Sequence, residues 1–311
     1  MPGYDTIRLW LPKEKVKNTE LLSEIPCLLK NVKEIHYQKT DISCITGNLE
    51  NFKVQVNERS VSLIGSLCKY GLGNNIETLN RQKTKEAITK LSDELHLPIK
   101  EATITRIDLA ENLPMNFEVS FYYSFLGQVK YYDRLEQNNG VNYRNGVKEM
   151  LFYDKIHEQK INRAPIPDLL KESNLLRYEF RFKNHLRQQL KLNEVKADIL
   201  YNENFYFDIV NKWKSEYLKI SKHKLHNLEL KTFNNMKQFE KLLLLNGINS
   251  LGGEAVMLQI IEQAKRQGVF KNKMQEKRLK DKVKFLCKTP QLSFESDAIK
   301  ELDKKINQVM S

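Results

Sequence analysis

Residues Leu176–Asn184 read LRYEFRFKN and alternate apolar with charged side chains. Successive side chains of a β-strand point to opposite faces, so this segment is predicted to be a strand with two different faces. One face is apolar and consists of Leu176, Tyr178, Phe180 and Phe182. The other face is charged and consists of Arg177, Glu179 and Arg181. For an isolated strand, exposure of the charged face to water is the simplest interpretation, because half-buried antiparallel strands commonly show this pattern.

Two other predicted strands also place polar side chains on one face. In ITRIDLA, residues 104–110, the alternation brings Arg106 and Asp108 together. In KEMLFYDKIHEQ, residues 148–159, it brings Leu151, Tyr153 and Lys155 together. If the three strands are neighbours in one sheet, their polar residues form a single patch. The patch would contain Asp108, Tyr153, Lys155, Glu179, Arg106, Arg177 and Arg181.

This patch has the groups that chemistry on a phosphodiester requires. Carboxylates hold hard divalent cations, so Asp108 and Glu179 are predicted to bind Mg²⁺ or Mn²⁺, which polarises a phosphoryl oxygen. Guanidinium groups bind phosphate oxygens through paired hydrogen bonds. We therefore predict a phosphate-binding role for Arg106, Arg177 and Arg181.

Tyr153 is the candidate nucleophile among 13 tyrosines. A free phenol has a pKa of about 10, and a nearby cation is needed to lower it for reaction at neutral pH. We expect Lys155, on the same face, to supply that charge. Tyr178 faces the apolar side of its strand and is a weaker candidate. The alternative for Tyr153 is a packed side chain with a hydrogen-bonded hydroxyl.

The composition of the chain indicates a polyanionic partner. Its 311 residues include 51 Lys and Arg against 39 Asp and Glu, a formal net charge of +12. Nucleic acid is the expected partner, ahead of an anionic membrane surface. No apolar run approaches the roughly 20 residues of a spanning helix and no signal-peptide pattern is present, so we expect a cytoplasmic protein without membrane insertion. The four cysteines lack C-x-x-C spacing, which argues against a zinc site and a disulfide framework.

The pattern of secondary-structure signals predicts an α+β fold. Residues 1–190 are expected to form a largely antiparallel sheet with flanking helices, as a catalytic domain. Strands are expected at 4–12, 52–56, 60–67, 102–110, 129–133, 147–155 and 175–183, and helices at 83–95 and 117–126. Residues 191–311 are predicted to be an all-helical, basic DNA-binding or accessory region. Its helices are expected at 202–220, 233–245, 253–265 and 273–286, separated by breaks such as NGINS at 246–250.

The last of these helices is strongly basic. We predict that it contacts DNA phosphates through Lys277, Arg278, Lys280 and Lys284. The alternative is a charged face that contacts only water.

These motifs resemble the gene II/gene X replication-protein family of filamentous phages and related plasmids and mobile elements, which initiate rolling-circle replication. The resemblance covers roughly residues 4–192 and includes the segments YDTIRLWLP, SLCKYGLGNN and LLRYEFRFKNHLRQQL. It rests mainly on the order of three motifs, which are R-I-D, Y-x-K-x-x-E and R-[YF]-E-x-R. Matched to these motifs, the family's nucleophile falls on Tyr153, with Lys155 and Glu158 following it.

The resemblance implies an endonuclease that nicks one strand of origin DNA and later rejoins it. The tyrosine would be joined to the 5′ phosphate, which leaves a free 3′ hydroxyl for a polymerase. Supercoiled or single-stranded origin DNA, a host helicase and a host polymerase are the implied partners. The R-I-D aspartate is often followed by a further acid, for which Glu111 is the nearest equivalent, and His157 is a candidate third metal ligand.

A non-catalytic, sequence-specific DNA-binding protein that regulates replication or transcription is the alternative function. Such a protein would use the basic helices and the sheet, but it would not require Asp108, Tyr153, Lys155 and Glu179 to converge. The sequence leaves open whether the chain forms a homodimer.

Overall fold

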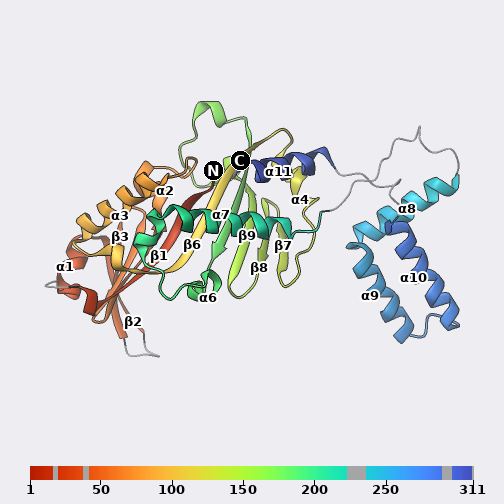
Figure 1. Ribbon diagram of the computed structural model, residues 1–311, viewed down its shortest axis with the longest axis horizontal. Coiled ribbons are helices and arrows are strands. Elements are labelled where there is room, and N and C mark those ends of the chain that lie inside the picture. The colour runs from red at the N-terminus through yellow and green to blue at the C-terminus, as the bar shows by residue number, and fades with distance from the viewer. Residues whose placement is uncertain (17–19, 38–41, 223–235, 289–295, 310–311) are drawn as a thin grey trace. The chain divides into compact units, whose positions relative to one another are not determined.

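The computed structural model describes residues 1–16, 20–37, 42–222, 236–288 and 296–309 (Figure 1). The chain divides into two compact units. The first unit consists of Met1–Tyr123, Gln128–Ile220 and Lys304–Ser311, and the second of Ser124–Gly127 and Ser221–Asp303.

The first unit is built on one antiparallel sheet. In the described residues, ten strands pair in the order β2-β3-β4-β5-β1-β6-β10-β9-β8-β7. Their bounds are β1 Gly3–Pro12, β2 Lys30–Tyr37, β3 Ile42–Leu49, β4 Phe52–Asn57, β5 Ser60–Ser66, β6 Thr103–Met115, β7 Asp133–Gln137, β8 Gly140–Arg144, β9 Lys148–Asp154 and β10 Asn174–Phe182. The expected α+β class with a largely antiparallel sheet is confirmed.

Helices flank this sheet. Their bounds are α1 Leu21–Cys27, α2 Leu67–Leu72, α3 Arg81–Leu95, α4 Val119–Tyr123, α5 Lys155–Ile161, α6 Leu186–Leu190 and α7 Glu203–Leu218. Short 3₁₀ turns lie at Lys13–Lys15, Ile99–Glu101, Asp168–Leu170 and Ala197–Tyr201. In Figure 1, α7 crosses in front of the central strands.

The apolar face of β10 is buried under α7. The ring of Tyr178 stacks on Phe152 of β9 and packs at a tilt of 35° against Trp213 of α7, with ring centroids 4.5 Å apart in both pairs. The Tyr178 hydroxyl donates a hydrogen bond to the Trp213 carbonyl at 2.9 Å, which satisfies a polar atom inside the core. Because α7 covers the sheet, the first unit extends past the expected boundary at residue 190 to Ile220.

Three local expectations differ from the structure. Segment 129–133 is not a strand, since Tyr131 has a positive φ of 67° and β7 begins only at Asp133. The helix expected at 117–126 is only the short α4, and residues 124–127 belong to the second unit. The strand expected to reach Lys155 ends one residue earlier, because the Asp154 side chain accepts a hydrogen bond from the His157 backbone N–H and caps α5.

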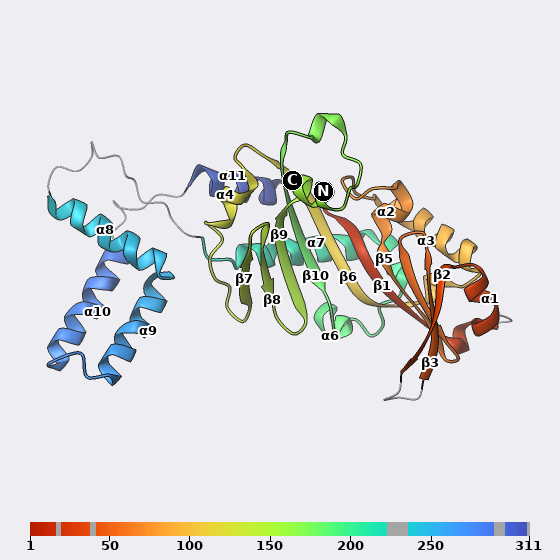
Figure 2. The ribbon, with the colours of Figure 1, turned by 180° about the vertical axis from the view of Figure 1, so that it is seen from behind.

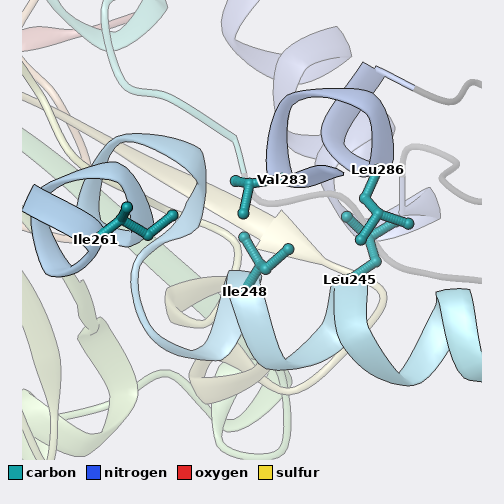
Figure 3. Packing of buried hydrophobic residues seen from close by; sticks show 5 residues of the cluster. All are labelled: Leu245, Ile248, Ile261, Val283 and Leu286. Carbon is teal, nitrogen blue, oxygen red and sulfur yellow. The ribbon is translucent and has the colours of Figure 1, made fainter. Parts of the chain in front are cut away.

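The second unit is helical, as expected. Its helices are α8 Met236–Ser250, α9 Gly253–Arg266 and α10 Lys273–Lys288. A further helix, α11 Asp297–Gln308, has residues in both units. A small core holds α8, α9 and α10 together (Figure 3) and consists of Leu245, Ile248, Ile261, Val283 and Leu286. The break expected at NGINS is absent, because α8 continues to Ser250 and buries Ile248. Residues 233–235, where this helix was expected to start, lie outside the described residues.

Within the ranges that the structure describes, no helix combines the length and the apolar character that crossing a membrane requires.

Candidate active site

The three strands with a polar face are neighbours in the sheet. β10 lies between β6 and β9 and is antiparallel to both. Arg181 is directly opposite Asp108 on β6, and Arg177 is directly opposite Tyr153 on β9. Directly opposite residues of antiparallel strands share a face, so the three polar faces form one continuous surface. The expectation that these strands are neighbours is therefore confirmed.

Two carboxylates, those of Asp108 and Glu179, are buried at the centre of this surface, with side chains 0% and 4% exposed. Arg106 binds Asp108 with a guanidinium fork: Nε donates to Oδ1 at 2.8 Å and Nη2 donates to Oδ2 at 2.5 Å. Arg181 Nε donates to Glu179 Oε1 at 2.6 Å and lies 3.5 Å from Asp108 Oδ2. The carboxylates predicted to bind a metal are thus paired with two of the arginines predicted to bind phosphate.

Burial and the arginines act in opposite directions on these carboxylates. Burial raises the pKa of Asp108 to about 7, against the hydrogen bonds from Arg106, and the negative charge of Glu179 adds to the increase. Burial also favours the neutral form of Glu179, but the charges of Arg181 and Arg177 outweigh it and lower the pKa of Glu179 to about 2. At neutral pH Glu179 is therefore ionised.

Arg177 is a buried cation held by residues that are distant in the sequence. Its Nη2 donates to Asp5 Oδ2 at 2.5 Å, and its Nε lies 3.6 Å from Glu179 Oε2. Asp5 lies where the register between β1 and β6 shifts, and such a bulge changes the face to which a side chain points. The Ser66 hydroxyl donates to the other Asp5 oxygen at 2.5 Å. Asp5 was not predicted as a site residue, because regular alternation along β1 does not reveal a bulge.

Asn75 is a second site residue that the sequence did not predict. Its Oδ1 accepts hydrogen bonds from Lys155 Nζ at 2.9 Å and from Gln159 Nε2 at 3.2 Å. Its backbone carbonyl accepts from Arg177 Nη1 at 3.0 Å. The loop after α2 therefore joins α5 to β10. The sequence signal for Asn75 was its place in SLCKYGLGNN, one of the segments that carry the family resemblance.

Tyr153 lines a cavity of about 400 Å³ beside the buried carboxylates. Its hydroxyl donates to Glu179 Oε2 at 3.3 Å, and Arg181 lines the same cavity. Gly140 of β8 is directly opposite Tyr153, and a Cβ at that position would lie 2.4 Å from the Phe152 carbonyl oxygen and 3.1 Å from Tyr153 Cβ. Glycine therefore lets the backbone of β8 approach β9 closely beside the candidate nucleophile.

The Tyr153 phenol is protonated in this environment. Burial raises the pKa of Tyr153 well above its usual range. The charge of Arg177 opposes this increase, whereas the negative charges of Glu179 and Asp5 add to it. The charges of the protein alone therefore do not lower the pKa of Tyr153, although the sequence analysis expected Lys155 to do so.

Lys155 is placed differently from the sequence expectation. It is the first residue of α5 rather than the last of a strand, so it does not continue the alternation from Tyr153. Its side chain is fully buried, and Nζ donates to Glu158 Oε2 at 2.6 Å as well as to Asn75. Burial and the positive charge of Arg177 lower the pKa of Lys155. Lys155 thus neutralises Glu158 and anchors α5 to the loop after α2.

Glu111 and His157 were weaker site candidates. Glu111 is directly opposite Tyr178, which places it on the apolar face, and its Oε2 lies 3.0 Å from the amino group of Met1. The structure therefore separates Glu111 from the patch. β6 also continues through Pro114, beyond the strand expected at 102–110. His157 is exposed in the first turn of α5 and lines the cavity with Glu158.

The carboxylates as arranged here do not fit a divalent cation. The oxygens of Asp108 and Glu179 are directed at Arg106, Arg181, Arg177 and Tyr153. Among the residues that the structure describes, no group of three His, Cys, Asp or Glu side chains is placed to hold a metal ion. Arg106 and Arg181 are 23% and 25% exposed, whereas Arg177 is buried, so these two are the cations of the site that solvent reaches.

The predicted DNA-binding residues of α10 fall into two groups. Lys277, Arg278 and Lys284 are exposed. Lys280 instead pairs with Glu262 of α9 and with Glu276, the latter at 2.7 Å. Lys280 therefore connects two helices. Its charge is already balanced by these carboxylates, so it attracts a phosphate less strongly.

A comparison with protein families places this geometry in context. The family model for the N-terminal part of the replication-associated protein G2P matches residues 23–216, more than half of the chain. The chain belongs to this family. It is the gene II family of filamentous-phage replication initiators, which makes replication initiation its role and DNA its partner. The matched residues include β6, β9, β10 and most of α7, but not β1 with Asp5. A comparison with curated proteins gave no match.

We predict that Arg177→Gln strongly destabilises the sheet. The substitution leaves Asp5 and Glu179 buried without their shared cation, which costs about 3–5 kcal/mol of unfolding free energy. Urea denaturation at pH 7 measures this loss, and Arg181→Gln, at a more exposed position, should lose less. The stabilisation from the depressed pKa of Glu179 is fully present above its unfolded value of 4.5 and is lost as the pH falls through the folded value of about 2, so the difference from the parent protein should already be smaller at pH 4 than at pH 7. An equal loss at both pH values would contradict this explanation.

We predict that the exposed cations of α10 bind DNA without regard to sequence. Replacing Lys277, Arg278 and Lys284 together by Gln should weaken binding to all duplexes. The slope of log affinity against log salt should fall by about 0.9 for each phosphate that the variant no longer neutralises. Lys280→Gln is the matched control, and its slope should stay close to that of the parent protein because Lys280 is already paired. A triple variant with an unchanged slope would show that α10 does not contact phosphates.

Proposed function

We propose that the chain nicks one strand of origin DNA through Tyr153 and later rejoins it. The observation that carries this proposal is the Tyr153 hydroxyl hydrogen-bonded to Glu179 in a cavity that Arg181 also lines. Membership of the replication family supports a DNA substrate. Supercoiled or locally single-stranded origin DNA is the proposed form, since a scissile phosphate must leave the duplex to enter this cavity.

In the proposed reaction, Tyr153 Oη bonds to the scissile phosphorus while the bond from phosphorus to the 3′ oxygen breaks. The phenol proton passes through water to the departing 3′ oxygen, so that no proton is gained or lost overall. The products are a 5′ phosphotyrosine and a free 3′ hydroxyl, from which a host polymerase would extend behind a host helicase. Attack by a 3′ hydroxyl reverses the step and releases Tyr153. One phosphodiester replaces another, so the cycle requires no ATP.

The raised pKa of Tyr153 supports a resting state that does not react. A buried phenol next to ionised Glu179 keeps its proton until positive charge enters the cavity. A bound Mg²⁺ or Mn²⁺ would supply that charge and polarise the phosphoryl oxygen. Lys155 is less suited to this role, because its ammonium group already pairs with Glu158.

We further propose that DNA and the cation bind together. Asp108 and Glu179 are the candidate cation ligands, but Arg106 and Arg181 pair with them in the free protein. A DNA phosphate competes for the same guanidinium groups, because arginine binds phosphate and carboxylate oxygens with the same paired geometry. When the arginines turn to phosphate, the carboxylate oxygens become available for a cation.

A non-catalytic DNA-binding protein is the alternative function. Such a protein has no need to hold a tyrosine hydroxyl on a buried carboxylate, or a glycine opposite that tyrosine. The cluster of Asp108, Tyr153 and Glu179 therefore favours the enzyme.

We predict that Tyr153→Phe abolishes the covalent protein–DNA adduct. The change removes one oxygen, so folding and DNA binding should remain near those of the parent protein, whereas no other group replaces the nucleophile. Incubation with an origin-containing single strand and Mn²⁺, followed by denaturing electrophoresis, detects the adduct. Tyr178→Phe, on the opposite face of the sheet, is the matched control and should retain it. Peptide mapping of the parent adduct that finds DNA on another tyrosine would refute the assignment.

We predict that Mn²⁺ binds more tightly in the presence of single-stranded DNA than in its absence, by about 5- to 150-fold, the usual range for coupled sites. Electron paramagnetic resonance measures free Mn²⁺, with DNA alone as the blank. Asp108→Asn should remove the DNA-dependent binding and the nicking activity. Glu111→Gln, on the other face of β6, should retain both. Equal Mn²⁺ affinity with and without DNA, or full nicking in EDTA, would contradict the proposal.

A further inference from the structure

The polar face of the sheet continues beyond the candidate active site. Arg106 of β6 is directly opposite Arg8 of β1, Arg8 is opposite Ile64 of β5, and Ile64 is opposite Lys53 of β4. The row goes on through Asn48 and ends at Lys30. Directly opposite residues share a face, so one line of side chains crosses six strands from the site outward. We name this line, from Arg106 to Lys30, the cross-strand row.

The face that carries the cross-strand row lies opposite the covering helices. On β4 the other face consists of Phe52, Val54 and Val56, which are fully buried. The Phe52 ring packs edge-on against Tyr70 of α2 at 5.3 Å, and α1 also contacts β4. Lys53, between these buried residues, is exposed. Figure 2 shows β10, β6 and β1 from the side away from α7.

Three cations of the cross-strand row are available to a ligand. Arg8, Lys30 and Lys53 are exposed, and no carboxylate of the described residues lies within ion-pair distance of them. Some other surface lysines of the same unit are paired, as in Lys90 with Glu50 at 3.2 Å. Three unpaired cations in one line that contains no acidic residue favour a polyanion of extended shape.

An exposed tryptophan lies beside the cross-strand row. Trp10 is two residues from Arg8 on β1, faces the same side, and is 42% exposed. It is directly opposite Ser62 and Thr103, so small side chains flank the indole ring. Exposed aromatic rings next to cations bind single-stranded nucleic acid, because unpaired bases stack on the ring while the cations bind phosphates. A duplex keeps its bases in its own stack, so this combination favours a single strand.

We propose that the cross-strand row and Trp10 form a track for single-stranded DNA that leads to Tyr153. This inference rests on the proposed function, since the track begins at Arg106, which holds Asp108 of the candidate site. Adjacent strands are about 4.8 Å apart, so the row extends over about 24 Å, comparable to the shortest single-strand sites of about 4 nucleotides. The track would hold the strand by phosphate contacts and stacking, whereas the cavity receives the scissile phosphate.

Binding of oligothymidylate to the full chain tests this track, with fluorescence anisotropy as the readout. The triple variant R8Q/K30Q/K53Q should lower the slope of log affinity against log salt by about 0.7 for each phosphate that it no longer neutralises, the value for single strands. Trp10→Leu should weaken binding by about 5- to 150-fold, the effect of removing one stacked base. The control is the double variant K83Q/K85Q, which removes exposed cations of α3 and should leave both quantities close to those of the parent protein.

Intrinsic fluorescence gives an independent readout. The chain has two tryptophans, of which Trp213 is fully buried and Trp10 is exposed. Oligothymidylate should therefore protect the emission from quenching by acrylamide, and Trp10→Leu should remove this protection. Unchanged affinity and salt slope in the triple variant, or equal quenching with and without DNA, would overturn the track. The Tyr153→Phe variant should show full protection, so failure of the track and failure of the nicking chemistry give different results.

Discussion

Two carboxylates buried in the middle of a sheet require cations close by, from their own strands and from the strand beside them. Asp108 and Glu179 are in this position, and Arg106, Arg181 and Arg177 supply the charge. An unpaired charge at this depth would cost several kcal/mol, so each partner of the network depends on the others. Three features of the fold meet this electrostatic requirement. β10 lies between two polar strands, the bulge of β1 brings Asp5 to Arg177, and the loop after α2 accepts a hydrogen bond from Arg177.

The sequence predicted this network where regular alternation applied. The period of two along β6, β9 and β10 placed Asp108, Tyr153 and Glu179 on one face, and their register brings them together. Alternation stops at a helix cap, which is why Lys155 is oriented differently from expectation. It also fails at a bulge, which concealed Asp5. The sequence could not show that Glu179 bonds both Arg181 and Tyr153, because these contacts depend on distances in the folded sheet.

The elements of the fold were likewise predicted where local periodicity is strong, and missed where contacts distant in the sequence decide the structure. Segments with strong apolar periodicity, such as β4, β5 and α3, were predicted close to their observed bounds. β2 and β3, and the short β7 and β8, were not predicted, because edge strands and polar hairpins carry little apolar alternation. The expected boundary at residue 190 marked a change from strands to helices, but it could not reveal that the apolar face of Tyr178 needs α7 as its cover.

The place of Tyr153 within β9 has a mechanical consequence. β9 is bonded to β10 on one side and to β8 on the other, so the residue that would carry the DNA belongs to an internal strand. A helicase that unwinds DNA joined to Tyr153 would pull on this strand. Force along β9 would load the hydrogen bonds of both neighbours together in shear, whereas an edge strand could peel away one bond at a time. The sheet would therefore serve as an anchor that resists tension while replication proceeds.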